Sequence, residues 1–320
     1  MMDMVIGIDV SKFRFDVALL TSNGKYREKK FKQGEAGFIS LLDWLGRYDV
    51  IGSHVCMEAT GGLEQPLALF LHQAGMKVSV VNPALVEAYG RSELTRAKTD
   101  KQDARLIARF CYQHSPPFWT PPEPEVVTLQ ALVRRLDDLL GLETKEKNRR
   151  YMAMPVARAS IDTVLKTVQD EIVNVRKQIK EHIDRHPEFK EKKELLETIP
   201  GIGEKTVAVL LAFLSPFERF NSSKAVVAYA GLNPKVRQSG KWRGASPIAK
   251  AGNALLRKAL YFPAIVAKRY NPVIRSFYER LIAQGKRPKQ AVVAAMAKLL
   301  RIAFGVLKRG TPFQANYALD

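Results

Sequence analysis

Residues 4–31 read MVIGIDVSKFRFDVALLTSNGKYREKKF, and this stretch decides the fold of the N-terminal part of the chain. An apolar run leads into Asp9, a second extended run follows from Phe13 to Leu20, and a third reaches Phe31. The pair Asn23-Gly24 between the second and third runs is typical of a tight hairpin turn. The stretch therefore predicts three strands that pair antiparallel in chain order.

Helix and strand signals alternate after this meander. They are an amphipathic helix at 36–47, a buried strand at 53–57 that leads into Glu58, a helix at 62–73, a strand at 77–81 and helices beyond Pro83. Three antiparallel strands followed by α/β units are the element order of ribonuclease-H-like folds. We expect an α/β domain with a ribonuclease-H-like fold over residues 1–115.

The rest of the chain is predicted to be mostly helical. Prolines at 116, 117, 121, 122 and 124 interrupt any helix in that region. Residues 125–196 are charged, nearly free of glycine and helical in period, which predicts paired helices or a coiled-coil arm. An ordinary helical bundle is the alternative for this segment. Residues 197–320 form a third predicted domain that is mostly helical.

The charge balance indicates a polyanionic partner. The chain of 320 residues has a formal net charge of +19 and a pI near 9.9. Between Pro234 and Gly310 there are eighteen Lys and Arg residues and one acid, Glu279, so this stretch alone carries +17. A membrane surface also attracts basic residues, but the stretch has no basic tail beside a lipid anchor. Nucleic acid is therefore the expected partner.

Other features of the sequence narrow the class of protein. No apolar run approaches the roughly 18 residues that a membrane helix needs, and residues 1–9 lack the pattern of a secretory signal. Cys56 and Cys111 are isolated thiols in apolar segments, which fits a reducing cytoplasm and provides no zinc-binding pair. We expect a cytoplasmic protein without a membrane partner.

Four carboxylates occupy positions that suit a metal site. Asp9 and Glu58 each end an apolar strand, and Asp100 and Asp103 are three residues apart, so a helix presents both on one face. Acids gathered in this way repel one another unless cations lie between them, and oxygen ligands suit Mg²⁺. The sequence predicts two Mg²⁺ ions at Asp9, Glu58, Asp100 and Asp103, with Mn²⁺ as the alternative ion.

Each acid also has an ordinary structural interpretation. Asp9 could simply end a strand, Glu58 could cap the helix that follows, and Asp100 and Asp103 could be solvated acids near the start of a helix. Asp16 lies in the second strand, where we expect it to face solvent or to pair with a lysine or arginine. The functional interpretation depends on the four acids occurring together in this fold.

One rival fold begins in a similar way. A sugar-kinase or actin-like ATPase also starts with a glycine-rich aspartate strand and a hairpin. Its phosphate loop requires Asp-x-Gly, whereas Val10-Ser11 follows Asp9 here, and the sequence has no second phosphate loop. The sequence therefore disfavours the ATPase interpretation.

The segment TIPGIGEKT at 198–206 is similar to the hairpin of a helix-hairpin-helix motif. Gly201 and Gly203 permit a tight turn, and the helix after them would offer free backbone N–H groups and Lys205 to a phosphate. Such a contact does not depend on base sequence. The alternative is a helix joint that only packs.

A basic, glycine-containing loop follows at 238–246, with the sequence QSGKWRGAS. Trp242 could stack on a base or sugar, and the cations would bind a phosphate backbone. The cations predicted for this role are Lys241, Arg243, Lys250, Arg257 and Lys258. The Ser239 hydroxyl could attack phosphorus if a metal or cation lowers its pKa, although a Ser-Gly turn is the simpler interpretation.

Several motifs together resemble the DEDD transposases of the insertion-sequence-one-ten group, also called bridge recombinases. The resemblance covers nearly the whole chain in the same order. The motifs are GIDVSK at 7–12, MEATG at 57–61, NP at 82–83, KTDKQDA at 98–104, IPGIG at 199–203, GLNP at 231–234, SG at 239–240 and KAGN at 250–253.

The resemblance implies an RNA-guided DNA recombinase. The family's RuvC-like domain would hold Mg²⁺ with the four acids, and Ser239 matches the serine that forms a transient 5′-phosphoserine link, with Ser246 as the alternative nucleophile. Strand exchange would pass through a Holliday-junction-like intermediate. Donor DNA, target DNA and a structured bridge RNA would be the partners, in a homodimer or homotetramer joined through the helical arm.

Two other functions remain open at this point. A RuvC-like junction resolvase or nuclease would hydrolyse DNA with a metal-activated water and leave no strand linked to the protein. A non-enzymatic architectural protein would bind nucleic acid through the hairpin and the basic segment, with the acids only structural. We expect a transposase located in the cytoplasm with the nucleoid.

Overall fold

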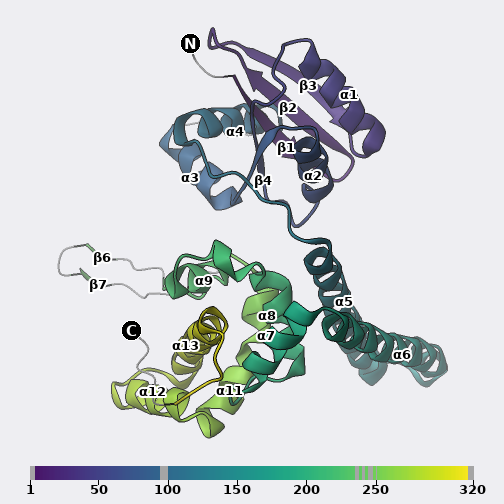
Figure 1. Ribbon diagram of the computed structural model, residues 1–320. Coiled ribbons are helices and arrows are strands. Elements are labelled where there is room, and N and C mark those ends of the chain that lie inside the picture. The colour runs from purple at the N-terminus through teal and green to yellow at the C-terminus, as the bar shows by residue number, and fades with distance from the viewer. Residues whose placement is uncertain are drawn as a thin grey trace. The chain divides into compact units, whose positions relative to one another are not determined.

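The computed structural model describes residues 4–93, 100–234, 238–239, 242–243, 248–249 and 251–315 (Figure 1). The contacts within the chain divide it into two compact units, Met1–Pro121 and Pro122–Asp320. Because this division separates two units, the three-domain organisation stays a prediction.

A five-stranded mixed sheet forms the centre of the N-terminal unit, with strand order β3-β2-β1-β4-β5. The β1–β2 and β2–β3 pairs are antiparallel, whereas β1–β4 and β4–β5 are parallel. The strands are β1 Val5–Val10, β2 Arg14–Leu20, β3 Tyr26–Lys32, β4 His54–Glu58 and β5 Lys77–Val81. The expected mixed α/β architecture and the antiparallel meander are thereby confirmed.

Helices cover both faces of this sheet (Figure 1). The helices are α1 Glu35–Gly46, α2 Gln65–Gln73, α3 Pro83–Ser92 and α4 Asp100–His114. Ile6 and Ile8 of β1 belong to the apolar cluster formed with α1 and α2. Val5, which points to the opposite face, packs with Ile107 and Cys111 of α4. Strand alternation therefore determines which residues of β1 face α4.

The predicted helix at 62–73 begins later, at Gln65. Gly61 and Gly62 have φ angles of 71° and 107°, which a helix does not accommodate. The residues before the helix form a turn that follows β4 directly. This turn belongs to the candidate site.

The proline-rich segment does more than interrupt a helix. The Ser79 hydroxyl lies 3.0 Å from the carbonyl oxygen of Pro116 and 2.9 Å from that of Pro117. The Trp119 N–H donates to the Val78 carbonyl oxygen over 2.7 Å, so the segment runs along the edge strand β5. Pro124 begins the next helix at a position that needs no intrahelical hydrogen bond.

The described part of the C-terminal unit is mostly helical. Its longer elements are α5 Pro124–Met152, α6 Pro155–Arg185, α7 Pro187–Glu197, α8 Glu204–Leu214, α9 Ser223–Tyr229, α10 Ala254–Ala259, α11 Tyr261–Tyr270, α12 Pro272–Ala283 and α13 Pro288–Arg309. A single turn of 3-10 helix covers Phe217–Arg219. One large apolar cluster joins residues from α5 through α13.

The paired helices α5 and α6 have two different ends. Leu129 and Val133 of α5 and Ile179 of α6 lie in the cluster that also contains α8. At the connection between α5 and α6, Tyr151 is 89% exposed and Val156 is 91% exposed. The inner halves of the pair therefore belong to the core, and the outer ends present apolar side chains to solvent.

Among the described residues, α13 is the one helix that is long and apolar enough to cross a membrane. Contrary to this finding, the sequence pattern predicts no apolar segment of that length. Its apolar residues, including Leu299, Leu300 and Ala303, are buried in the large cluster. A core helix of a folded unit has the same length and composition. The burial of these side chains favours that role for α13.

Candidate active site

The predicted metal site begins at Asp9, one residue before the end of β1. Alternate residues of a strand share a face, so Gly7 and Asp9 point to the side of the sheet that α4 covers. The Asp9 side chain is half-buried there. The first predicted ligand therefore faces the helix that carries Asp103.

Glu58 ends β4, the parallel neighbour of β1. The register pairs Ile8 with Met57, which places Asp9 and Glu58 at the next position on adjacent strands. Cys56, two residues earlier, packs against α4, so Glu58 points to the same face. Since neighbouring strands lie about 4.8 Å apart, these two carboxylates are side by side.

Gly7 lets α4 lie directly on β1. A Cβ atom at Gly7 would be 2.3 Å from the Ala104 carbonyl oxygen and 2.3 Å from the Ala108 nitrogen. The helix backbone thus occupies the space that any side chain would need. Asp103 precedes Ala104 at this contact and is half-buried. Because Gly7 has no side chain, the turn of α4 that carries Asp103 lies close to the sheet.

The described side chains complete only part of the predicted cluster. Asp100 begins α4, but its side chain lies outside the described part of the structure. Among the side chains that are described, no three His, Cys, Asp or Glu residues form a group that could hold a metal ion. The carboxylate donors fit a hard divalent cation in chemistry, and the four-acid site stays a prediction in geometry.

Glu64 organises the turn that follows Glu58. Its Oε2 atom accepts hydrogen bonds from the backbone N–H groups of Thr60 and Gly62, both over 2.9 Å. The Thr60 hydroxyl lies 3.3 Å from the same oxygen. The Ala59 N–H donates to the Val81 carbonyl oxygen over 2.9 Å. Sequence reasoning missed this residue, although a glutamate after a Gly-Gly turn was a usable signal.

Asp16 lies opposite Asp9 on the neighbouring strand. Its Oδ1 atom is 3.1 Å from the Lys30 ammonium, which confirms the expected pairing with a lysine. The expectation that Asp16 could face solvent is wrong, because the residue is only 5% exposed. The antiparallel register and α4 bury a position that the sequence pattern leaves ambiguous.

A second ion pair ties α4 to β3. The Arg105 guanidinium donates two hydrogen bonds to Glu28, from Nε to Oε1 over 2.6 Å and from Nη2 to Oε2 over 2.8 Å. The hydrogen bond with Glu28 raises the pKa of Arg105. The guanidinium also lies 5.2 Å from the centre of the Tyr26 ring. This bidentate contact fixes the position of α4 two residues beyond Asp103.

Both cysteines are buried free thiols between β4 and α4. A hydrogen bond with Cys111 and burial together raise the pKa of the Cys56 thiol. Cys56 therefore acts as an apolar packing group two residues before Glu58.

The predicted helix-hairpin-helix turn connects α7 to α8 and packs against α11. Gly201 has a φ angle of 105°, and a Cβ atom there would be 2.7 Å from the Ala267 Cβ atom. Gly203 is the N-cap residue of α8 and has open space around its Cα atom. Burial lowers the pKa of Lys205 in the first turn of α8. Packing against α11 thus explains Gly201, and a phosphate contact at Gly203 and Lys205 stays a prediction.

Ser239 lies in a short hairpin. β6 (Gln238–Ser239) pairs antiparallel with β7 (Trp242–Arg243), with Ser239 opposite Trp242. Of the other predicted residues of this segment, Lys241, Ser246 and Lys250 lie outside the described residues, as do the side chains of Ser239, Trp242 and Arg243. Sequence reasoning described the segment as a loop and missed this strand pair.

The base of the hairpin is held by close backbone contacts. The Ala249 N–H donates to the Asn233 carbonyl oxygen over 2.8 Å. Gly252 has a φ angle of 135°, and a Cβ atom there would be 2.4 Å from the Tyr229 carbonyl oxygen. Asn253 caps α10 by accepting from the Leu256 N–H over 3.0 Å.

Two of the predicted phosphate-binding cations have partners within the chain. Arg257 donates to the Ala230 carbonyl oxygen over 2.9 Å, and the Lys258 ammonium lies 2.6 Å from Asp137 Oδ1. These contacts connect α10 to its neighbours. If Arg257 or Lys258 binds nucleic acid, its side chain must share or give up this contact within the chain.

Two family models match the chain. Residues 6–154 match the DEDD transposase family of IS110, described as Transposase, and residues 193–279 match the Transposase IS116/IS110/IS902 family. The chain is 36% identical over 313 residues to the pilin gene-inverting protein of Moraxella lacunata, covering 96% of this chain and 97% of that protein.

More distant relatives carry transposase names. The chain is 24% identical to the transposase for insertion sequence element IS1111A of Coxiella burnetii, over 98% of this chain and 92% of the relative. It is 27% identical to the transposase for insertion sequence element IS1328 of Yersinia enterocolitica, over 97% and 98%. The chain belongs to the IS110 family of transposases and is a DNA transposase or recombinase.

Proposed function

We propose that this transposase exchanges DNA strands through a covalent link at Ser239, with divalent cations held by Asp9, Glu58, Asp100 and Asp103. The observation that carries the proposal is the position of Asp9 and Glu58 on adjacent parallel strands beneath the helix with Asp103. The family match of residues 6–154 to a DEDD transposase supports it.

The proposed step conserves the phosphodiester bond energy. The Ser239 hydroxyl oxygen forms a bond to phosphorus while the bond from phosphorus to the 3′ oxygen breaks. The 5′ phosphate stays on the serine, and the released strand end leaves as a 3′ hydroxyl with a proton in place of its bond to phosphorus. Attack by another 3′ hydroxyl on the phosphoserine reverses the chemistry and joins new strands, which generates a Holliday-junction-like intermediate.

The four carboxylates would hold two Mg²⁺ ions, or Mn²⁺ in their place. When bound, these ions offset negative charge at the scissile phosphate and orient it for attack. Glu64 would keep the turn after Glu58 in place, and the Arg105–Glu28 contact would keep α4 over the strands.

An end-labelled DNA carrying the element's junction tests the nucleophile. We expect a DNA–protein adduct that survives denaturation and disappears in Ser239→Ala while Ser246→Ala retains it. An adduct that persists in Ser239→Ala and vanishes in Ser246→Ala would move the nucleophile. Free ends without an adduct would support hydrolysis by a junction resolvase, and full activity of Asp9→Ala would support a non-enzymatic role for the acids.

The basic stretch from Pro234 to Gly310 suits a phosphate backbone of either nucleic acid, and we propose that a structured guide RNA is one partner. Sequence choice would then come from base pairing, while the protein reads backbone and shape. Purification from cells that carry the element, with and without ribonuclease, tests this. We expect a discrete RNA to co-purify with the protein, and removal of this RNA to abolish strand exchange by the purified protein. Strand exchange without the RNA would refute RNA guidance.

We propose that the outer ends of α5 and α6 join subunits into a dimer or tetramer. Tyr151 and Val156 at the connection are largely exposed apolar side chains, and Met152 and Met154 between them are 83% and 73% exposed. We expect Val156→Asp to reduce the mass measured by light scattering to that of a smaller assembly. An unchanged mass would exclude this surface.

Inversion of a DNA segment is a second candidate function. The relative from Moraxella lacunata is named a pilin gene-inverting protein and matches nearly the full chain. A plasmid with two junction sequences in inverted orientation distinguishes the outcomes. Inversion without excision favours an invertase, whereas transfer to a second plasmid favours transposition.

A further inference from the structure

A row of charged residues crosses three strands on the face that α4 covers. The register places Asp9 of β1 opposite Asp16 of β2, and Asp16 opposite Lys30 of β3. Directly opposite residues in antiparallel strands point to the same face, with Cβ atoms roughly 4.5–5.5 Å apart. The row therefore runs acid, acid, base from the predicted metal ligand to the sheet edge.

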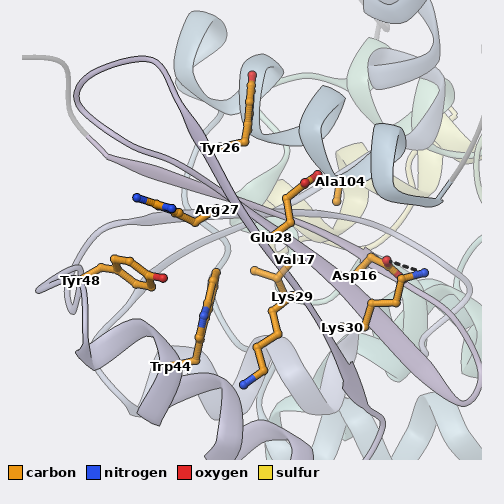
Figure 2. A pocket seen from close by; sticks show the side chains of 10 residues that line it. All are labelled: Asp16, Val17, Tyr26, Arg27, Glu28, Lys29, Lys30, Trp44, Tyr48 and Ala104. Carbon is orange, nitrogen blue, oxygen red and sulfur yellow. Dashed lines mark ion pairs between the residues drawn. The ribbon is translucent and has the colours of Figure 1, made fainter.

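The middle residue of the row is buried and the last is not. Asp16 is 5% exposed, whereas the Lys30 side chain that it pairs with is 55% exposed. Figure 2 shows Asp16, Lys30, Glu28 and Ala104 among the residues that line a hollow of about 590 Å³, with the Asp16–Lys30 ion pair drawn as a dashed line. The hollow continues around the edge of β3, where Lys29 and Trp44 line it from the other face. Ala104 follows Asp103, so the buried carboxylate lies beside both β1 and the turn of α4 that carries a predicted ligand.

The Asp16–Lys30 pair joins β2 to β3, two strands that already pair antiparallel from Arg14–Lys32 to Leu20–Tyr26. A structural role alone therefore does not require a charged pair at this position. Like charges directly opposite one another in a sheet are destabilising, and burial of Asp16 strengthens the effect of its charge on Asp9. Lys30, half in water, offsets only part of that charge. The arrangement raises the negative potential beside Asp9.

We propose that Asp16 and Lys30 are positioning residues that set the affinity of the Asp9 site for divalent cations, in opposite directions. Asp16 strengthens cation binding through its buried charge, and Lys30 weakens it by partly neutralising Asp16. Both act through space on the cation rather than as ligands. The inference rests on the proposed function in one respect, namely that Asp9 carries a divalent cation.

Mn²⁺ titration of the full chain, read from the electron paramagnetic resonance signal of free Mn²⁺, tests the inference. We expect Asp16→Asn to weaken Mn²⁺ binding about fivefold or more and Lys30→Gln to tighten it about twofold or more. The double substitution should lie between the single variants. A structural role predicts that breaking the ion pair from either side weakens binding, so the opposite signs separate the two explanations.

Two matched controls test whether charge alone produces the shift. Lys29→Gln makes the same change one residue away, on the opposite face of β3, as Figure 2 shows. Asp43→Asn removes an exposed carboxylate on α1. We expect both to change the Mn²⁺ affinity by clearly less than Lys30→Gln does, since exposed charges at a distance are screened. Shifts as large as those at Asp16 and Lys30 would overturn the proposal.

Asp9→Asn separates failure of this inference from failure of the proposed function. If the parent chain binds no Mn²⁺, or Asp9→Asn binds it unchanged, the metal site itself is refuted and the inference falls with it. If Asp9→Asn loses binding while Lys30→Gln and Asp16→Asn do not move it in opposite directions, only the inference is overturned. Should Asp16→Asn not fold, as judged by melting in a chelator, Lys30→Gln decides alone, because its side chain is largely in solvent.

Discussion

The two units of the protein differ in the size and the distribution of their net charge. The N-terminal unit, Met1–Pro121, has 15 Lys and Arg against 13 Asp and Glu, a formal charge of +2, and the C-terminal unit accounts for the remaining +17. In the first unit, acids gather on one face of a sheet beside α4. In the second, the stretch between Pro234 and Gly310 carries +17 by itself, so the rest of that unit has no net charge.

This difference indicates how the reaction is divided. Carboxylates that hold divalent cations are disfavoured in strongly basic surroundings, because positive charge repels those cations. A DNA-binding surface needs the reverse. Substitutions in the N-terminal unit should therefore change chemistry with little effect on binding, and substitutions in the basic stretch should do the opposite.

The largest effect is expected for the predicted ligands. Asp103→Asn and Asp9→Asn should each reduce strand exchange at least about a hundredfold, since even outer partners of metal ligands cost 10- to 100-fold. DNA affinity, measured by gel shift at fixed salt, should change by less than about twofold. Strand exchange at the parent rate in either variant would contradict the assignment of chemistry to this face.

Gly7→Ala should have the next largest effect. The new Cβ atom would lie 2.3 Å from the Ala104 carbonyl oxygen, so α4 must move away from β1. We expect a loss of about 2 kcal/mol or more in the free energy of unfolding of the N-terminal unit, measured in urea, together with loss of exchange. Gly46→Ala is the matched control, because Gly46 is the last residue of α1 and a Cβ atom there meets nothing within 4 Å, so we expect little loss of stability.

Salt dependence tests the other half of the comparison. Lys286 and Lys289 are exposed in the basic stretch. If each contacts a phosphate, its change to glutamine should reduce the magnitude of the slope of log affinity against log salt concentration by about 0.9. Lys25→Gln and Lys77→Gln remove exposed charges from the N-terminal unit. Equal changes in slope from the two pairs would remove the distinction between the units.

The smallest effects are expected for two ion pairs, one in each unit. A double-mutant cycle on Arg105 and Glu28 should give a coupling free energy of about 1 kcal/mol, because the contact is bidentate although Arg105 is 40% exposed. The Lys258–Asp137 pair, with Lys258 63% exposed, should give about 0.5 kcal/mol or less. A larger coupling at Lys258 would indicate that α10 depends on this contact for its position.

Local pattern was sufficient for the element order and for several site positions. Alternation and the Asn23-Gly24 turn identify the meander, and the end of each apolar run identifies Asp9 and Glu58 as strand-end acids. The period of two in a strand and the conformational demands of a turn act over a few neighbours, so they can be read without the fold. The basic stretch is equally visible, since charge needs no geometry to be counted.

Tertiary structure alone decided which of these residues meet. The burial of Asp16 opposite Asp9 depends on strand register and on α4, and the contact of Glu64 with the turn after Glu58 depends on where α2 begins. Composition predicts that Arg257 binds a phosphate backbone, yet its side chain donates to the backbone carbonyl of Ala230. Sequence by itself determined the elements and the acids at their ends; the pairing of distant segments decided the charge around them, because burial and register arise only when those segments pack.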